Sequence, residues 1–351
     1  MADTSRALYQ PHAAALMALY GDVENFARGQ GEIPTGTPGS VLERSNARDY
    51  RYYAHQSYDA NGRKVEKYVA GPVGDPAADA KAKALRDRVQ ALGEAVRHIR
   101  LLAREGFKLV DAKAYATLAS LHNEFLFRAG ACLVGAHAFG TLLNQLGVRA
   151  AQYATQDVDI ARSAKLAFAT RPEMSFLDML KASGIAFSEV PGLDPRQPAT
   201  SFKEAGRSLF QVDLLVPSPD DRIGVVVVPE LKAHATSLPH LRYLLTDTQD
   251  AVVLAREGCC AVRVPAPARF AWHKLVVSQL RKRGEKALKD AAQAAVLLAV
   301  LAERHPGELE EAARALPASA RKHVARAAPA ARAALAAHAR ALEALDSIAA
   351  P

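Results

Sequence analysis

Apolar side chains recur at helical spacing over long stretches of the chain. Between about Asp75 and Glu105 they form one face of a predicted helix whose opposite face is charged. Shorter helices are expected at about Arg6–Ala27 and Ala112–Phe127. From Pro267 onward the pattern predicts helices at about Phe270–Lys282, Glu285–Glu303, Leu309–Leu316 and Ser319–Ile348, with Pro329 breaking the last.

Alternating apolar and polar positions predict a β-hairpin in the first third of the chain. Its strands are Tyr50–His55 and Arg63–Val69, and Asn61-Gly62 between them is a strong turn signal. The tyrosines have two explanations. They stack on bases while nearby Lys and Arg hold phosphates, or they pack the hairpin on a helix. Packing is favoured, because an isolated hairpin needs such support.

Short apolar strands alternate with helices in the middle of the chain. The strands are expected at Cys132–Val134, Val158–Ile160, Phe210–Val216, Ile223–Val228 and Cys260–Val264, and the helices at Gly135–Leu146 and Ser175–Ala182. This order predicts an α/β (α+β) fold with a mixed sheet. We expect an N-terminal helical region at 1–128 with the hairpin at about 40–71, a core at 129–265 and a C-terminal helical domain at 266–351.

Composition narrows the choice of partners and compartment. Half of the 351 residues are hydrophobic and 23% are charged, which excludes a wholly disordered chain. Lys and Arg exceed Asp and Glu by 45 to 37, a net charge of +8 that suggests a polyanionic partner such as RNA. The three cysteines form no disulfide framework and have no zinc spacing. With no signal peptide and no membrane span expected, the sequence favours the cytoplasm and no membrane partner.

Three aspartates stand in the predicted core strands. Asp157 and Asp159 are two residues apart on one strand, so both carboxylates point to the same face. Asp213 lies within another apolar strand, where it is costly to bury without a partner. Three carboxylates on adjacent strands repel one another, and two Mg²⁺ ions would relieve this. Two alternatives are open. Asp157 and Asp159 are turn or cap residues at a solvated strand end, or Asp220 or Asp221 takes the place of Asp213 as the third acid.

This pattern, with a glycine turn at Gly135 opening a helix after a strand, resembles the polymerase-β-type nucleotidyltransferases. Over about Gly39–Leu301 the chain resembles an uncharacterised bacterial nucleotidyltransferase-fold family, distantly similar to abortive-infection toxin nucleotidyltransferases. The matching segments are Lys67–Pro72, Val134–Phe139, Leu146–Arg149, Thr155–Asp159, Val264–Leu275 and Lys289–Ala294.

The resemblance implies a role for each matching residue. Asp157, Asp159 and Asp213 would bind metal and catalyse, and Gly135 would seat the triphosphate with the helix that follows. Ala136 stands where many members carry serine, so His137 is a candidate for that phosphate contact. Lys274 would reach the triphosphate, and Lys289 and Asp290 would line the same cleft. Without the resemblance, these last three residues are equally explained as exposed helix positions, and the cluster Arg281-Lys282-Arg283 with Lys286 as a solvated helix end or an RNA contact.

The implied activity is transfer of a nucleoside monophosphate from an NTP to an acceptor hydroxyl, with Mg²⁺ or Mn²⁺ as cofactor. RNA, especially a tRNA end, is the favoured acceptor, and a toxin role would imply an antitoxin partner. Two alternatives remain open: a catalytically silent module that binds nucleic acid or another partner, and a transferase acting on a protein or small molecule.

Overall fold

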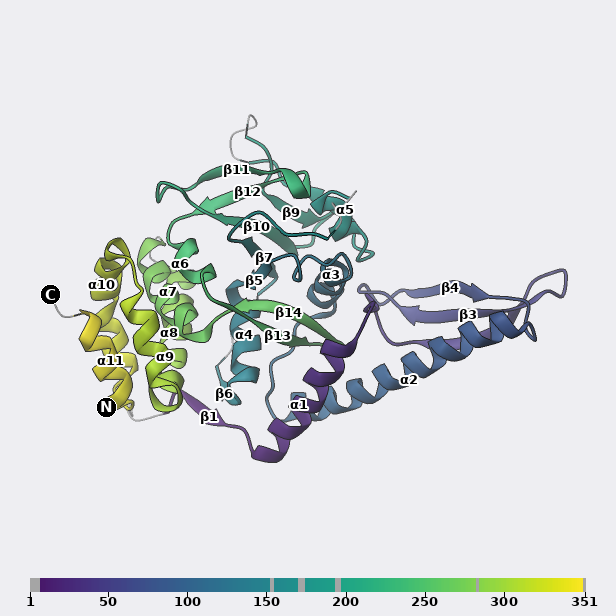
Figure 1. The fold of residues 1–351 in the computed structure, drawn as a ribbon, viewed down its shortest axis with the longest axis horizontal. Helices are drawn as coiled ribbons and strands as arrows, with labels where there is room; N and C mark the ends of the chain where they lie inside the picture. Colours follow the sequence, from purple (N-terminus) through teal and green to yellow (C-terminus); the bar gives the residue numbers. More distant parts are fainter. Residues whose placement is uncertain (1–6, 152–154, 170–173, 193–196, 282–283, 350–351) are drawn as a thin grey trace.

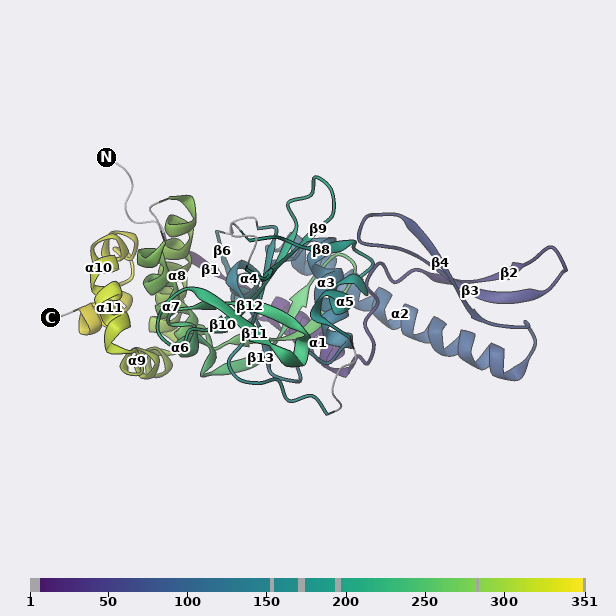
Figure 2. The same ribbon diagram turned by 90° about the horizontal axis from the view of Figure 1, so that it is seen from above.

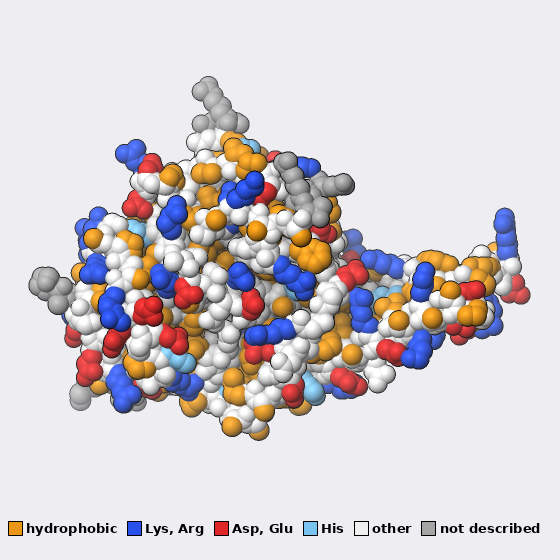
Figure 3. Space-filling view, viewed as in Figure 1, with side chains coloured by type: hydrophobic (Ala, Val, Ile, Leu, Met, Phe, Trp, Pro, Cys, Tyr) orange, Lys and Arg blue, Asp and Glu red, His pale blue; other side chains and the backbone are white. Residues whose placement is uncertain are grey.

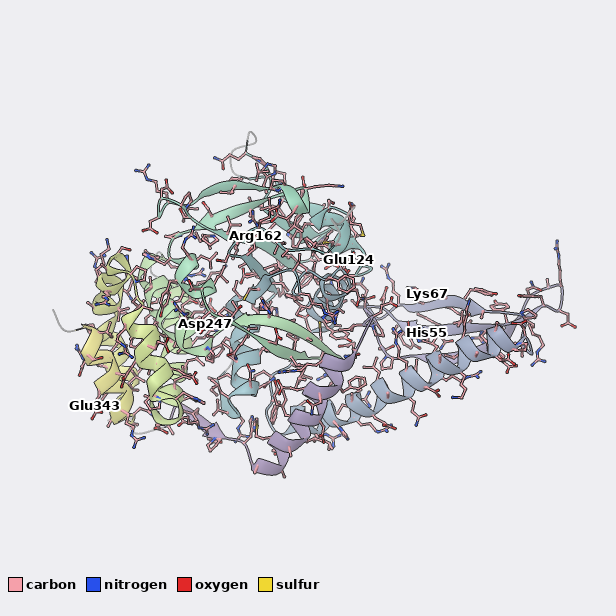
Figure 4. All side chains as sticks on the ribbon, viewed as in Figure 1. His55, Lys67, Glu124, Arg162, Asp247 and Glu343 are labelled. Atoms are coloured by element: carbon pink, nitrogen blue, oxygen red, sulfur yellow. The ribbon has the colours of Figure 1, made fainter. Side chains whose placement is uncertain are left out.

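The computed structural model describes residues 7–151, 155–169, 174–192, 197–281 and 284–349. A central sheet stands between a group of C-terminal helices on one side and a projecting arm on the other (Figures 1 and 2). Figure 4 marks these parts with labelled residues: Arg162 in the sheet, Glu343 in the C-terminal helices, and His55 and Lys67 on the arm.

The central sheet has seven strands within the described residues, and it mixes parallel and antiparallel pairs. Five run in the order β11-β12-β10-β7-β5, and β9 pairs with both β10 and β8. Strand β10 is parallel to β7 and β12, whereas β5 is antiparallel to β7. The bounds are β5 Ala131–Val134, β7 Asp157–Arg162, β8 Phe187–Glu189, β9 Ser201–Glu204, β10 Gln211–Pro217, β11 Gly224–Val228 and β12 Ala233–Leu238. The predicted α/β class is confirmed.

Further elements pack around this sheet. A second hairpin, β13 with β14, lies against β5, α1 and α3, and the short strand β1 pairs with β6. A 3-10 turn, Pro229–Leu231, leads into β12. The bounds are β1 Tyr9–Pro11, α1 Ala14–Gly29, α3 Ala112–Asn123, α4 Gly135–Gln145, β6 Val148–Ala150, α5 Phe176–Lys181, α6 Leu241–Leu245, β13 Thr248–Leu254 and β14 Cys259–Pro265. The first helix begins later than predicted, because Pro11 ends a strand instead.

The C-terminal helices form a bundle beside the sheet. They are α7 Pro267–Leu280, α8 Glu285–Arg304, α9 Pro306–Arg314, α10 Ala318–Ala334 and α11 Ala339–Ala349. The prediction that Pro329 breaks the last helix is wrong, because α10 continues through it to Ala334. Burial of Ala327, Ala328 and Ala331 against neighbouring helices offsets the hydrogen bond that proline removes.

The arm consists of α2 (Pro76–Arg104) and a three-stranded sheet, β2 (Ser40–Ser45), β3 (Arg51–Tyr58) and β4 (Lys64–Ala70). The predicted hairpin is confirmed as β3 and β4, and β2 is an additional strand. The Asp75 carboxylate accepts the amide of Ala78 and caps α2 at its predicted start.

The predicted domain boundaries stay predictions. One hydrophobic cluster runs from α3 through the central sheet into α11, so these segments share a core. Among the helices of the described residues, none has the length and apolar character that a bilayer span requires.

Candidate active site

The strand register places the three aspartates on one face of the central sheet. Val158 and Ile160 in β7 are fully buried, so Asp157 and Asp159 point to the opposite, half-buried face. Asp213 of β10 lies directly opposite Asp159, and its Oδ1 accepts a 2.8 Å hydrogen bond from the Gln211 side chain. The structure therefore brings together all three acidic residues that the sequence predicts.

Asp157, Asp159 and Asp213 form a row of carboxylates, hereafter the acidic row. Gly135, the first residue of α4, lies against this row. Val134, the last residue of β5, pairs with Asp159, and α4 begins at the next residue. Gly135 has a φ of +69°, and a Cβ there would lie 2.0 Å from Asp159 Oδ2. Only glycine satisfies both conditions. The N-cap residue of α4, Val134, has an apolar side chain that makes no capping hydrogen bond, so the first backbone amides of α4 face the carboxylates without a cap from Val134.

A cavity of about 390 Å³ opens over this row, between the sheet and helices α7 and α8. Its acidic wall is formed by Asp157, Asp159 and Asp213, next to Gly135 and Ala136. The facing wall carries basic side chains with Asp290, namely Lys274, Arg281, Lys286, Lys289 and Asp290. Apolar side chains line the remainder, among them Leu238, Leu241, Leu244, Phe270 and Val277. A phosphate chain with its cations and an apolar ring would match these three surfaces.

The basic wall is held by a buried ion-pair network. Asp290 Oδ1 lies 2.6 Å from Lys274 Nζ, and its Oδ2 lies 2.7 Å from Arg281 Nε. Lys274 and Asp290 are only 7% and 3% exposed, so their interpretation as exposed helix residues is wrong. Lys286 reaches across the cavity, with its Nζ 3.8 Å from Asp157 Oδ2. Burial and the nearby Lys274 lower the pKa of half-buried Lys289.

Other predicted residues lie elsewhere. His137 is buried in α4 and does not appear among the described residues that line the cavity. Burial lowers its pKa to about 4, which keeps its imidazole neutral at pH 7. Asp220 and Asp221 are exposed in the turn after β10, where Asp220 accepts the Ser218 hydroxyl. Lys282 and Arg283 lie outside the described residues.

Sequence reasoning missed Arg281 and Lys286 as cavity residues, although a signal was present. Lys286 precedes Asp290 by four residues in α8, so the two share one helix face, and Arg281 directly follows α7, which carries Lys274. The apolar wall carries no comparable signal, because its named residues come from three separate elements, β12, α6 and α7.

The acidic row carries excess negative charge, which suits a divalent cation. Burial, followed by repulsion from Asp213, raises the pKa of Asp159 to about 6, while Lys274 acts in the opposite direction. Carboxylate oxygens are the donors that Mg²⁺ prefers. Within the described part of the chain, no three metal-ligating side chains are grouped closely enough to hold an ion as they stand. The donor type and the excess charge fit Mg²⁺, and Asp157, Asp159 and Asp213 are the residues that would hold it.

The raised pKa of Asp159 predicts a pH-dependent stability. The folded state binds this proton more tightly than the unfolded chain, so stability falls as pH rises from about 4 to 6. The contribution is up to about 3 kcal/mol. Urea denaturation of wild type and Asp159→Asn, at pH 4.5 and 7 without divalent cations, measures this contribution. It is the difference between the two proteins in how much unfolding free energy they lose between these pH values. Wild type should lose more stability than the variant over this interval, and parallel losses would contradict the prediction.

Comparison with known proteins assigns the segment that forms this cavity to a family. No curated protein and no solved structure matches the chain. A family model described as nucleotidyltransferase matches residues 113–317, which is more than half of the chain. This match spans β5, α4, β7 and β10, and it also spans α7 and α8 with the basic wall. Both walls of the cavity thus lie within the matched segment, and the chain belongs to this nucleotidyltransferase family.

Proposed function

We propose that this chain transfers a nucleoside monophosphate from an NTP to an acceptor hydroxyl, in a reaction that depends on Mg²⁺ or Mn²⁺. The acceptor oxygen bonds to the α-phosphate as the bond to the β-phosphate breaks, and pyrophosphate leaves. The observation that carries the proposal is the alignment of Asp159 opposite Asp213, beside the start of α4, which Val134 does not cap. Cation-holding carboxylates and phosphate-holding amides are what nucleotidyl transfer needs side by side.

The two walls of the cavity would have different roles, with cations bound at the acidic wall and phosphate charge balanced at the basic wall. Asp157 and Asp159, with Asp213, would hold the divalent cations, which when bound supply charge neutralisation at the phosphates and activation of the acceptor hydroxyl. The backbone at Gly135 and Ala136 would orient the triphosphate. Lys274 and Arg281 would balance its negative charge, and the apolar wall would pack against the base. Asp213 already accepts Gln211 at Oδ1, which leaves Oδ2 to take the proton of the acceptor hydroxyl.

RNA is the acceptor that we favour, with a tRNA end as the leading choice. The net charge of +8 supports a polyanionic acceptor. A toxin role, in which an antitoxin protein restrains the enzyme, is part of the same proposal. Transfer to a protein or small molecule is the alternative for the acceptor.

Label transfer from each α-labelled NTP into total RNA or total protein tests the proposal. Label should enter RNA with Mg²⁺ or Mn²⁺, and it should disappear with EDTA or in the double variant Asp157→Ala/Asp159→Ala. Entry into protein would move the acceptor to the alternative class. With no label and no cation-dependent NTP binding, the chain would instead be a silent binding module.

A further inference from the structure

The arm leaves one face of its sheet uncovered. Helix α2 has 29 residues and is about 44 Å long. Its first half projects from the body together with β2, β3 and β4 (Figures 1 and 2). There it buries only small side chains, Ala78 and Ala82, beneath the sheet. The helix therefore covers one face of the three strands.

The tyrosines of the arm divide between the two faces. Tyr53 packs on the α2 side, where its hydroxyl donates a 2.8 Å hydrogen bond to Asp79 and its ring lies under the Arg86 guanidinium. The packing explanation of the hairpin tyrosines thus holds for Tyr53. Tyr52 precedes it in β3 and points to the opposite face, away from the helix. Packing on a helix therefore does not account for the tyrosines of that outer face.

Three of these tyrosines form a row of rings, hereafter the tyrosine ladder. The ring centroids of Tyr50 and Tyr52 lie 6.3 Å apart, and those of Tyr52 and Tyr68 lie 5.6 Å apart. The Tyr50 hydroxyl donates a hydrogen bond to Tyr68, which raises the pKa of Tyr50 and ties the two ends of the row together. Gly71 makes room for the ladder, because a Cβ there would lie 2.7 Å from the Tyr50 hydroxyl. Even so, Tyr50 and Tyr68 remain 40% and 62% exposed.

The charges around the ladder favour a polyanion. Residues 40–70 contain six basic and four acidic side chains. Glu43 pairs with Arg51 of the neighbouring strand β3, and Glu66 of β4 pairs across β3 with Arg44 of β2. Asp59 accepts backbone amides within its own turn. The two ion pairs neutralise Arg44 and Arg51 as well as the glutamates, so the segment keeps a net charge of 6 − 4 = +2. Figure 3 shows the arm with hydrophobic-coloured side chains, a class that includes tyrosine, next to Lys and Arg.

We propose that the outer face of β2, β3 and β4 binds single-stranded RNA, with bases stacked on the tyrosine ladder and phosphates held by the basic residues beside it. Exposed aromatic rings on a basic surface recognise unpaired bases, because every base offers a flat π-face. A base-paired duplex hides those faces, so the surface discriminates against it. This inference deepens the proposed function by giving the acceptor a second contact, and it depends on that function for its role in transfer.

Fluorescence anisotropy of a labelled single-stranded RNA of about twelve nucleotides tests this binding without NTP or divalent cation. Tyr52→Ala and Tyr68→Ala are each expected to weaken binding about tenfold, whereas Tyr52→Phe and Tyr68→Phe keep the ring and stay within about twofold of wild type. Duplex RNA of the same length should compete poorly. Phe125→Ala removes an aromatic side chain that is 57% exposed elsewhere on the surface, and it should have no effect.

The double variant Asp157→Ala/Asp159→Ala separates this inference from the proposed function. It should bind the RNA as wild type does, even though it transfers no label. Equal binding by wild type and both alanine variants would overturn the inference. So would losses in the phenylalanine variants as large as in the alanine variants, or equal competition by duplex RNA. Binding of anionic vesicles or a protein, with no RNA binding, would assign the face to another partner and overturn it as well.

Discussion

Asn in place of Asp159 is expected to reduce nucleotidyl transfer about a hundredfold to a thousandfold, a loss typical of removing a key charge-stabilising group, and to raise the melting temperature at pH 7.5. The carboxylate is half-buried opposite Asp213, and burial and repulsion raise its pKa to about 6. Its ionised form therefore costs folding free energy at pH 7.5. Asparagine removes that charge with little change in shape, so activity and stability should move in opposite directions.

Transfer rates at saturating NTP and melting curves on the same preparations would show whether Asp159→Asn loses activity while it gains stability. Asp220→Asn is the matched control, because Asp220 is exposed in the turn after β10 and was the competing choice for the third acid. It should change neither quantity. Loss of activity in Asp220→Asn, with full activity in Asp159→Asn, would remove the acidic row from the reaction.

Periodicity was sufficient to predict the elements that carry the acidic row. The alternation in β7 and β10 places apolar residues on the buried face and aspartates on the other, so the sequence predicts their common orientation. Gly135 likewise marks the strand-to-helix turn, because few other residues adopt its positive φ. The chemical roles of these residues remain predictions.

What the sequence could not show depends on contacts between distant segments. Strand β2 and the three-residue strands β1, β6 and β8 owe their conformation to a partner strand, which local propensity does not reveal. The burial of Lys274 and Asp290 is a similar case. The two residues are sixteen positions apart and meet only because α7 and α8 fold back on one another. From sequence alone, a charged residue in a helix is predicted to be exposed unless a partner for its charge is known.

Ala in place of Asp290 is expected to destabilise the fold by about 3–5 kcal/mol, the usual cost of removing one partner from a buried ion pair. Asp290 is 3% exposed and compensates both Lys274 and Arg281. Without it, two cations would face each other at the cavity wall. Urea denaturation at pH 7 measures the loss.

Asp346→Ala is the matched control, because Asp346 pairs with Arg332 at the same 2.7 Å distance as Asp290 with Arg281, and the two arginines are similarly exposed, whereas the Asp346 side chain is 55% exposed and that of Asp290 only 4%. Exposed pairs contribute only about 0–1 kcal/mol. Equal losses in Asp290→Ala and Asp346→Ala would contradict the assignment of a buried network.

The double variant Lys274→Met/Asp290→Leu separates stability from function. Replacing both buried partners by apolar groups removes the buried ammonium, and Arg281, whose side chain is 43% exposed, stays hydrated, so most of the stability lost in Asp290→Ala should return. Nucleotidyl transfer should not return, because the ammonium that faces the acidic row is gone. Recovery of both would mean that the pair serves packing alone. Recovery of stability without activity would mean that this buried pair holds positive charge in place for the triphosphate.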